Sequence, residues 1–291
     1  GDAAYLGGHF FLADDVRTKS LAALDATTLQ PVPGFRSTHW DRSGGDLVVS
    51  SRAIYQAPTH FYGYDPDRDK PPFYPQTDDT VWAYDPDTGG VVEDRTHEIR
   101  NLTGVTTVGN RLVVARRLGQ SSRFPANRIT VYAPDGTKQT SYRLPVRGYI
   151  AHLTTVDGDL LAVGSFKGIP TAYGPLSGAI VRFDLRTGKL TPGFNAWLDG
   201  PVYHASVRGS SIYVNGLFSD FYPEITKMSA DSRWRDEFAP KPFDANGVLL
   251  RTTALGDTVW VGGPVNRFLD ATTGAVVADP TGDRLSISSV T

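Results

Sequence analysis

Histidine and arginine occupy matching positions in a pattern that repeats along this 291-residue chain. His39, His204 and Arg251 stand at equivalent places of the repeat, and Asp41 and His152 lie close to that place in their own copies. An imidazole can transfer protons or bind a metal, a carboxylate can orient the imidazole, and a guanidinium can hold an anion. If the protein is an enzyme, these five residues are its candidate catalytic groups.

A second candidate site is a segment at 54–79 that is rich in aromatic residues and proline. Large rings on a proline-stiffened loop suit stacking on sugars or anchoring a protein partner, because they give much contact area at low entropic cost. The alternative is that the rings pack the segment onto the rest of the protein. The candidate ligand-binding residues are Tyr55, His60, Phe61, Tyr62, Tyr64, Phe73 and Tyr74, together with Tyr203 elsewhere in the chain.

Three carboxylates in this segment, Asp65, Asp67 and Asp69, have the alternate spacing that some Ca²⁺ loops use. The central glycine and distal glutamate of an EF-hand loop are missing, so we predict no metal site and keep Ca²⁺ binding here as the alternative. No other cofactor is predicted. The nucleophile elbow, the phosphate-binding loop, the zinc-protease motif and the dinucleotide fingerprint are all absent from the sequence.

Composition narrows the class of protein. A hydrophobic fraction of 40% and a net charge of −2 are typical of a soluble globular chain. The sequence has no Lys/Arg runs and no apolar stretch long enough to cross a bilayer, so we expect neither nucleic-acid binding nor membrane insertion. The absence of cysteine excludes disulfides and thiol chemistry.

The abundance of glycine and proline, 30 and 20 residues, favours a β-rich protein that is secreted or exposed on a cell or virion surface. The chain begins at Gly1 without an initiator methionine or a signal peptide. We therefore expect it to be a processed or trimmed product.

Short strands are the elements that must position these residues. A unit of about 45 to 50 residues recurs, with a tight turn before each apolar second strand and a third strand that ends in Asp before Thr-Gly or Asp-Gly. A fourth strand, such as Lys189–Phe194, follows at once. The predicted second strands, which are about 43, 65, 49, 51 and 47 residues apart, are Ala3–Gly8, Asp46–Ser51, Arg111–Arg116, Leu160–Ser165, Ser211–Gly216 and Thr258–Gly263.

Six copies of four strands predict an all-β fold, a six-bladed β-propeller that fills residues 1–291 as one domain. The C-terminal stretch Arg284–Thr291 has the character of a first strand. We expect it to pair with Ala3–Gly8 and close the ring, which removes the exposed strand edges. The one long spacing predicts that 54–79 is an insertion in blade two.

The repeat resembles that of the delta-60 repeat β-propeller family. The matching residues are Gly164-Ser165-Phe166, Val181-Arg182-Phe183-Asp184 and Pro192-Gly193-Phe194-Asn195. Kelch-like propellers are the second choice, because they share the double glycine seen at Gly7-Gly8 and Gly262-Gly263, although their usual Trp pattern is missing. The resemblance implies a fold and transfers no activity.

In a propeller the first strand of each blade lines a central channel, which would place the His and Arg candidates near the channel mouth. Blades two and five face each other across a six-bladed ring, so we do not expect His39 and His204 to bind one ion together. Polar residues would also line such a channel simply because water fills it.

The leading hypothesis is a non-enzymatic propeller that binds a carbohydrate or protein partner through its top-face loops. The alternative is a propeller enzyme, a hydrolase, lyase or cyclase with a His/Arg pocket. A structural spacer domain is the third possibility. The sequence indicates neither the ligand nor the oligomeric state.

Overall fold

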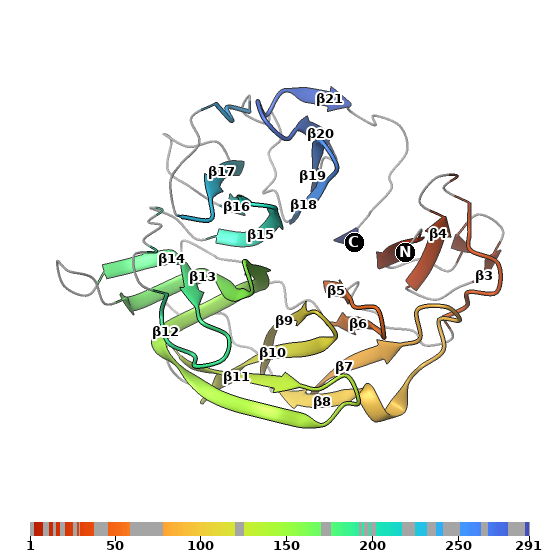
Figure 1. Ribbon diagram of the computed structural model, residues 1–291, viewed down its shortest axis with the longest axis horizontal. Helices are drawn as coiled ribbons and strands as arrows, with labels where there is room; N and C mark the ends of the chain where they lie inside the picture. Colours follow the sequence, from red (N-terminus) through yellow and green to blue (C-terminus); the bar gives the residue numbers. More distant parts are fainter. Residues whose placement is uncertain are drawn as a thin grey trace, which may run out of the picture. The chain divides into compact units, whose positions relative to one another are not determined.

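The computed structural model of the protein is built from β-strands, with one 3-10 turn, η1 (Glu93–Arg95), and no α-helix among the residues it describes (Figure 1). Those residues are 3–7, 12–13, 16–17, 21–25, 28, 30–37, 46–58, 78–119, 125–169, 176–191, 194, 198, 202–216, 225–231, 237–240, 251–262, 267–278 and 289–290. The all-β prediction is confirmed. The chain divides into two compact units.

Unit 1 comprises Gly1–Arg116, Thr130–Ser141 and Ser286–Thr291. Its sheets are antiparallel and run in the orders β22-β1-β4 and β5-β6-β7-β8, beside the two-stranded ladders β2-β3 and β9-β10. The strands are β1 (Ala3–Gly7), β2 (Leu12–Ala13), β3 (Val16–Arg17), β4 (Leu21–Asp25), β5 (Asp46–Val49), β6 (Ile54–Ala57), β7 (Asp78–Tyr84), β8 (His97–Arg100), β9 (Leu102–Val108) and β22 (Ser289–Val290).

Unit 2 comprises Arg117–Ile129 and Tyr142–Leu285. Its sheets run in the orders β12-β13-β14, β15-β16-β17 and β18-β19-β20-β21, each a meander of antiparallel neighbours. The strands are β13 (Asp159–Ile169), β14 (Leu176–Phe183), β15 (Val202–Arg208), β16 (Ser211–Gly216), β17 (Ile225–Ser229), β18 (Arg251–Leu255), β19 (Thr258–Gly262), β20 (Arg267–Asp270) and β21 (Val276–Ala278). Three strands, β10 (Arg111–Leu118), β11 (Ala126–Tyr132) and β12 (Lys138–Val156), contribute residues to both units.

One pairing register recurs in six antiparallel strand pairs, three in each unit; five are hairpins and the sixth pairs β22 with β1. The central residues of their second strands, Tyr5, Tyr55, Val113, Leu161, Tyr213 and Trp260, are 50, 58, 48, 52 and 47 residues apart. Two residues after each of these on the second strand is a residue that pairs with the first strand. We call the position of that first-strand partner the entry position. It is Ser289, Asp46, Gly104, His152, His204 and Arg251 in turn.

This register corrects the prediction for blade two. Asp46–Val49 is the first strand rather than the second, and the second strand is Ile54–Ala57, which the sequence assigned to the insertion. The turn between them lacks the expected Gly, Asn or Asp. Instead, the Ser50 hydroxyl accepts the backbone N–H groups of Arg52 and Ala53, which closes the turn through a side chain.

The turn from the third to the fourth strand is the same in four copies, as its Asp and Thr residues predicted. An Asp Oδ1 accepts both the backbone N–H and the hydroxyl of the Thr three residues later, at 2.7–2.9 Å. These hydrogen bonds lower the pKa values of Asp85, Asp184 and Asp270 below the usual range of a carboxyl. The four pairs are Asp25–Thr28, Asp85–Thr88, Asp184–Thr187 and Asp270–Thr273.

Neighbouring sheets contact each other through an equivalent tyrosine in both units. In unit 1 the Tyr5 hydroxyl donates to the carbonyl of Pro86 at 3.1 Å. In unit 2 the Tyr213 hydroxyl donates to the carbonyl of Ala271 at 2.7 Å, at the matching place of the Asp-Thr turn. Each tyrosine therefore fixes the turn of the next copy, so the repeat in sequence is also a repeat of contacts between sheets.

Aliphatic and aromatic side chains from adjacent sheets fill the cores. Tyr55 and Tyr84 in unit 1, and Phe166 and Trp260 in unit 2, are fully buried. Burial of such a side chain contributes about 1.5–3 kcal/mol each, which makes these rings principal sources of stability.

The sheets resemble propeller blades, as predicted, and β22 pairs with β1 through Leu6–Val290 and Gly7–Ser289, which confirms the pairing of the two chain ends. Six separate four-stranded blades are not seen in the described residues. Only β5–β8 and β18–β21 form four-stranded sheets, and β12 is one continuous strand where the prediction has a fourth strand, a loop and a first strand.

Candidate functional site

Two β-bulges place the histidines of unit 2. Ala151 is bulged out of the β12–β13 ladder and Tyr203 out of the β15–β16 ladder, in each case directly before the histidine. A bulge bends its strand and re-aims the side chain that follows. Thr103 is bulged in the same way directly before Gly104 in unit 1, so the bulge recurs at the same place of the repeat.

His152 and His204 stack face to face. Their ring centroids are 3.6 Å apart and the planes differ by 27°. His152 Nδ1 accepts the backbone N–H of Ala205 at 3.5 Å, and His204 Nδ1 accepts that of Thr252 at 3.5 Å. Each imidazole thus bonds to the residue just after the entry position of the next sheet.

The bond to Nδ1 fixes the tautomer of His204. A neutral imidazole carries one N–H, so a ring that accepts at Nδ1 carries its proton at Nε2. His204 therefore presents an Nε2–H donor. Metal-binding histidines have the opposite arrangement, in which one nitrogen donates outward and the other offers a lone pair to the ion.

The pKa of His204 lies well below the usual 6.5 of histidine, first because packed protein removes water from the ring and then because His152 and Arg251 add positive charge nearby. No carboxylate is among the groups that shift this pKa. At neutral pH His204 is therefore uncharged. We call His152, His204 and Arg251 the inner cluster.

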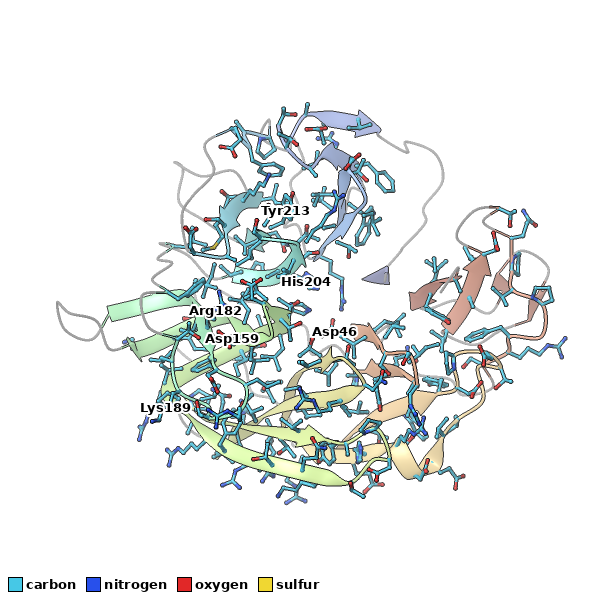
Figure 2. The ribbon with its side chains drawn as sticks, viewed as in Figure 1. Asp46, Asp159, Arg182, Lys189, His204 and Tyr213 are labelled. Carbon is cyan, nitrogen blue, oxygen red and sulfur yellow. The ribbon has the colours of Figure 1, made fainter. Side chains whose placement is uncertain are left out.

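Exposure differs within the inner cluster. His152 and Arg251 are 8% and 7% exposed, whereas His204, which Figure 2 labels, is of intermediate exposure as a whole residue. Tyr203, the bulged residue, is also of intermediate exposure. His204 and Tyr203 are thus the more exposed residues of this region.

Two members of the inner cluster lie near one end of their hairpins. His204 and Arg251 pair with Asn215 and Gly262, which stand at or near the ends of β16 and β19. Val163, the partner of His152, lies in the middle of β13. His204 and Arg251 therefore lie beside the strand ends from which the chain passes to the third strands.

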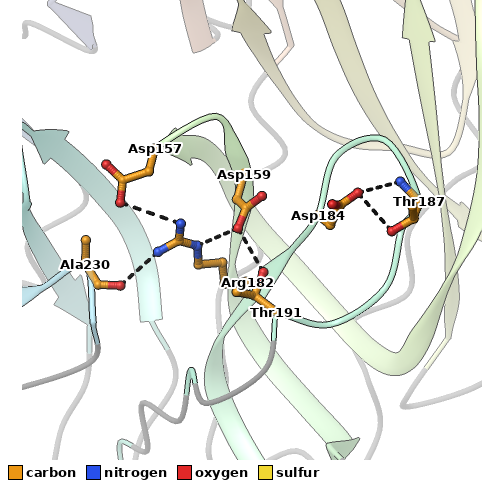
Figure 3. A network of polar contacts seen from close by, with 7 residues as sticks. All are labelled: Asp157, Asp159, Arg182, Asp184, Thr187, Thr191 and Ala230. Atoms are coloured by element: carbon orange, nitrogen blue, oxygen red, sulfur yellow. Dashed lines mark hydrogen bonds and ion pairs between the residues drawn. The ribbon is translucent and has the colours of Figure 1, made fainter.

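An arginine network stabilises the β12–β13 turn and joins it to the next sheet (Figure 3). Arg182 Nε donates to Asp159 Oδ2 at 2.8 Å, and its Nη1 donates to the carbonyl of Ala230 at 2.9 Å. Thr191 donates its hydroxyl to the same Asp159 oxygen at 2.9 Å. The outer pair with Asp157 is longer, at 3.5 Å, and that carboxylate is mostly exposed. The network holds the hairpin that carries His152.

The structure brings together three of the five candidate catalytic residues, His152, His204 and Arg251. His39 and Asp41 lie outside the described residues, and the register gives the entry position of blade two to Asp46 instead of His39. Tyr55, a candidate ligand-binding residue, is 1% exposed in β6 and fills the core of unit 1. The other aromatic candidates, His60, Phe61, Tyr62, Tyr64, Phe73 and Tyr74, and the carboxylates Asp65, Asp67 and Asp69 lie outside the described residues.

Thr252 and Ala205 are not among the residues predicted from the sequence. Their backbone N–H groups bind the two imidazoles, and Thr252 is fully buried. Its Oγ1 has no hydrogen-bond partner among the described residues. The repeat could have indicated both residues, because each histidine contacts the residue just after the entry position of the next copy.

Metal binding and membrane spanning find no support in the described part of the chain. No three His, Asp, Glu or Cys side chains gather there as an ion would require. No helix there is long and apolar enough to cross a membrane.

Comparison with known proteins gives no family assignment: no family model matches the chain, and no curated protein matches it either. The candidate site is therefore judged on its geometry alone.

Proposed function

We propose that the protein is a non-enzymatic binding propeller that recognises a carbohydrate or protein partner through the end of the blades where the inner cluster lies. The observation that carries the proposal is the stacked pair His152–His204, in which His204 is of intermediate exposure and lies near the strand end from which the chain passes to β17. Binding residues in repeat folds concentrate on such loops and on the strand ends beside them. The aromatic segment around Tyr62, Tyr64 and Tyr74 belongs to the same proposal as a second contact surface.

The finer architecture is also proposed here: six blades of the delta-60 type, with kelch-like propellers as the second choice. Six strand pairs with one register and four copies of the Asp-Thr turn support a sixfold repeat. A secreted or surface-exposed location remains part of this proposal and rests on composition.

The enzyme alternative has less support from the geometry. A catalytic histidine is usually oriented by a carboxylate and has a pKa near the working pH. Here a backbone N–H binds Nδ1 of His204, and its pKa is well below the usual histidine value because the ring is desolvated and lies beside His152 and Arg251. His204 is suited to donate a hydrogen bond rather than to take up a proton.

The test is a glycan array together with a pull-down from culture supernatant, with three proteins. They are the intact chain, the variant with Tyr62, Tyr64 and Tyr74 replaced by Ala, and the variant His152→Gln/His204→Gln. We expect retention of one class of partner by the intact chain and at least a tenfold loss in each variant. Arg208→Ala, at the exposed far end of β15, is the matched control and should bind normally.

Unchanged binding in both variants would refute the proposal. Turnover of a captured glycan that disappears in His204→Gln would establish the enzyme alternative instead.

A further inference from the structure

The charged residues are distributed unevenly along the chain. Residues 101–190 contain twelve Lys/Arg and four Asp/Glu, a net charge of +8, whereas the whole chain has a net charge of −2. The remaining residues therefore carry a net charge of −10. A chain that is nearly neutral as a whole thus has a strongly basic middle, which the overall composition conceals.

Strand β12 exposes part of this positive charge on one face. Arg143, Pro145 and Arg147 are exposed, and Leu144 and Val146 between them are buried. Because alternate residues of a strand point to the same face, the two arginines project from one side of β12, about 13 Å apart along it. Within the described part of the chain, neither guanidinium forms a hydrogen bond or an ion pair. Both are therefore available to a partner.

The neighbouring strand adds a third cation to the same face. Lys167 of β13 is exposed and pairs directly with Arg147 across the antiparallel ladder. Residues directly opposite each other on neighbouring strands point to the same face, and like charges in such a pair disfavour each other. A bound anion would relieve this repulsion.

The turn after β14 brings two more cations to β12. The hydroxyl of Tyr142 in β12 donates to the carbonyl of Leu185 at 3.0 Å, which ties the turn to the strand. Arg186 and Lys189 of this turn are exposed, and Lys189 is labelled in Figure 2. Asp184 is the one carboxylate among residues 184–189, so the turn is net positive.

The acidic residues of these strands lie far from the exposed arginines. β12, β13 and β14 contain one, Asp159, which lies with Asp157 at the β12–β13 turn, about 30 Å along the ladder from Arg147. Arg182 forms ion pairs with both carboxylates. Because charges are screened over about 8 Å at physiological ionic strength, these carboxylates do not offset the charge at Arg147.

The same surface favours an acidic polysaccharide over a nucleic acid. Proteins that bind single-stranded nucleic acid stack its bases on accessible aromatic rings, and no aromatic residue in the described part of the chain exceeds intermediate exposure. That part also has no α-helix to enter a groove of duplex DNA. Sulfate or carboxylate groups repeated along a polysaccharide need only cations presented at intervals, which β12 provides.

We propose that β12, β13 and the turn after β14 form a basic surface that binds an acidic polysaccharide carrying sulfate or carboxylate groups along its length. The cations of this basic surface are Arg143, Arg147, Lys167, Arg186 and Lys189. The proposal rests on the proposed binding function, to which it adds the chemical class of a partner. It does not require the inner cluster.

The test measures binding of the whole chain to heparin, which is sulfated, and to polygalacturonate, which is carboxylated, by titration calorimetry at pH 7.5. Dextran is the uncharged control, and single-stranded DNA of mixed sequence is the rival polyanion. We expect saturable binding to at least one acidic polysaccharide at about 50 mM NaCl and none to dextran. The affinity should fall at least about tenfold at about 300 mM NaCl, because binding releases counterions. Heparin alone would identify sulfate as the group, and polygalacturonate alone would identify carboxylate.

Two variants separate this surface from the net charge of the protein. Arg143→Gln/Arg147→Gln should weaken polysaccharide binding at least about tenfold. Arg52→Gln/Arg208→Gln removes two exposed arginines elsewhere, changes the net charge equally and should bind as the natural protein does. Arg143→Lys/Arg147→Lys keeps both charges and should retain most of the affinity, which a merely structural role of the two arginines would not explain.

The proposal is overturned by the absence of saturable binding to both acidic polysaccharides, by equal losses in the two Gln variants, or by tighter binding of DNA than of either polysaccharide. If the glycan array or pull-down captures a partner that neither salt nor Arg143→Gln/Arg147→Gln releases, the binding function stands and the basic surface fails. If an acidic polysaccharide binds through the basic surface and His152→Gln/His204→Gln loses no partner, the basic surface stands and the role of the inner cluster fails.

Discussion

At the scale of single residues, the imidazole of His204 is kept neutral by its surroundings. The loss of water from the packed ring and the charges of His152 and Arg251 all act against a proton on this ring, and its pKa is well below the usual 6.5. The unfolded chain has no such environment, so its histidine titrates normally. Below about pH 6.5 the unfolded chain therefore binds a proton that the folded chain does not, and stability falls as the pH falls.

We predict that His204→Gln reduces this loss of stability in acid. Between pH 8 and pH 5 the free energy of unfolding of the natural protein should decrease more than that of the variant. The difference between the two free energies of unfolding should change by at most about 1.4 kcal/mol per pH unit, the value for one proton. Urea unfolding at a series of pH values measures it. At pH 8 neither chain carries this proton, so the difference in free energy of unfolding there reports packing alone and serves as the internal reference. Parallel curves of the free energy of unfolding against pH would contradict the prediction.

At the scale of elements, the repeat was predictable wherever glycine, Asp or Thr marks its turns, because these residues adopt the required conformations or bind the backbone locally. The Asp184–Thr187 turn and its equivalents follow from the sequence for that reason. Blade two was assigned wrongly because Ser50 closes its first turn, and an apolar stretch followed by serines resembles a second strand. The pairing of His152 with His204 was outside the reach of sequence patterns, since it depends on bulges that only the ladder reveals.

Two arginines of unit 2, Arg182 and Arg208, form ion pairs with aspartates, and we predict that only the pairing of Arg182 matters for stability. Arg182 is 13% exposed and bonds to Asp159 and to the carbonyl of Ala230, whereas Arg208 is 43% exposed and faces Asp257, which is 99% exposed. Arg182→Met keeps the apolar stem and leaves two acceptors without their donor, at a cost of about 2–3 kcal/mol. Arg208→Met should change stability by less than about 0.5 kcal/mol.

Urea unfolding followed by tryptophan fluorescence compares these two variants with the natural protein. Equal losses would show that burial does not decide the strength of these pairs.

At the scale of the whole molecule, the pairing of β22 with β1 joins the two ends of the chain in one sheet. Leu6 lies opposite Val290, and Gly7 lies opposite Ser289. Without β22, the outer edge of β1 would expose unpaired backbone groups, a template for association with other chains. The C-terminal residues thus complete a sheet that the first residues begin.

The absence of cysteine makes this pairing directly testable. In Leu6→Cys/Val290→Cys the new side chains lie directly opposite on antiparallel strands, with Cβ atoms about 4.5–5.5 Å apart, so a disulfide should form on mild oxidation. It closes nearly the whole chain into a loop and should stabilise the protein by about 2–4 kcal/mol, chiefly by restricting the unfolded state. In Leu6→Cys/Ser289→Cys the side chains point to opposite faces of the sheet, so this pair should stay reduced. Mass spectrometry and thermal unfolding with and without reductant distinguish the two double-cysteine variants. Equal cross-linking of both pairs would mean that the register of β22 on β1 is not fixed.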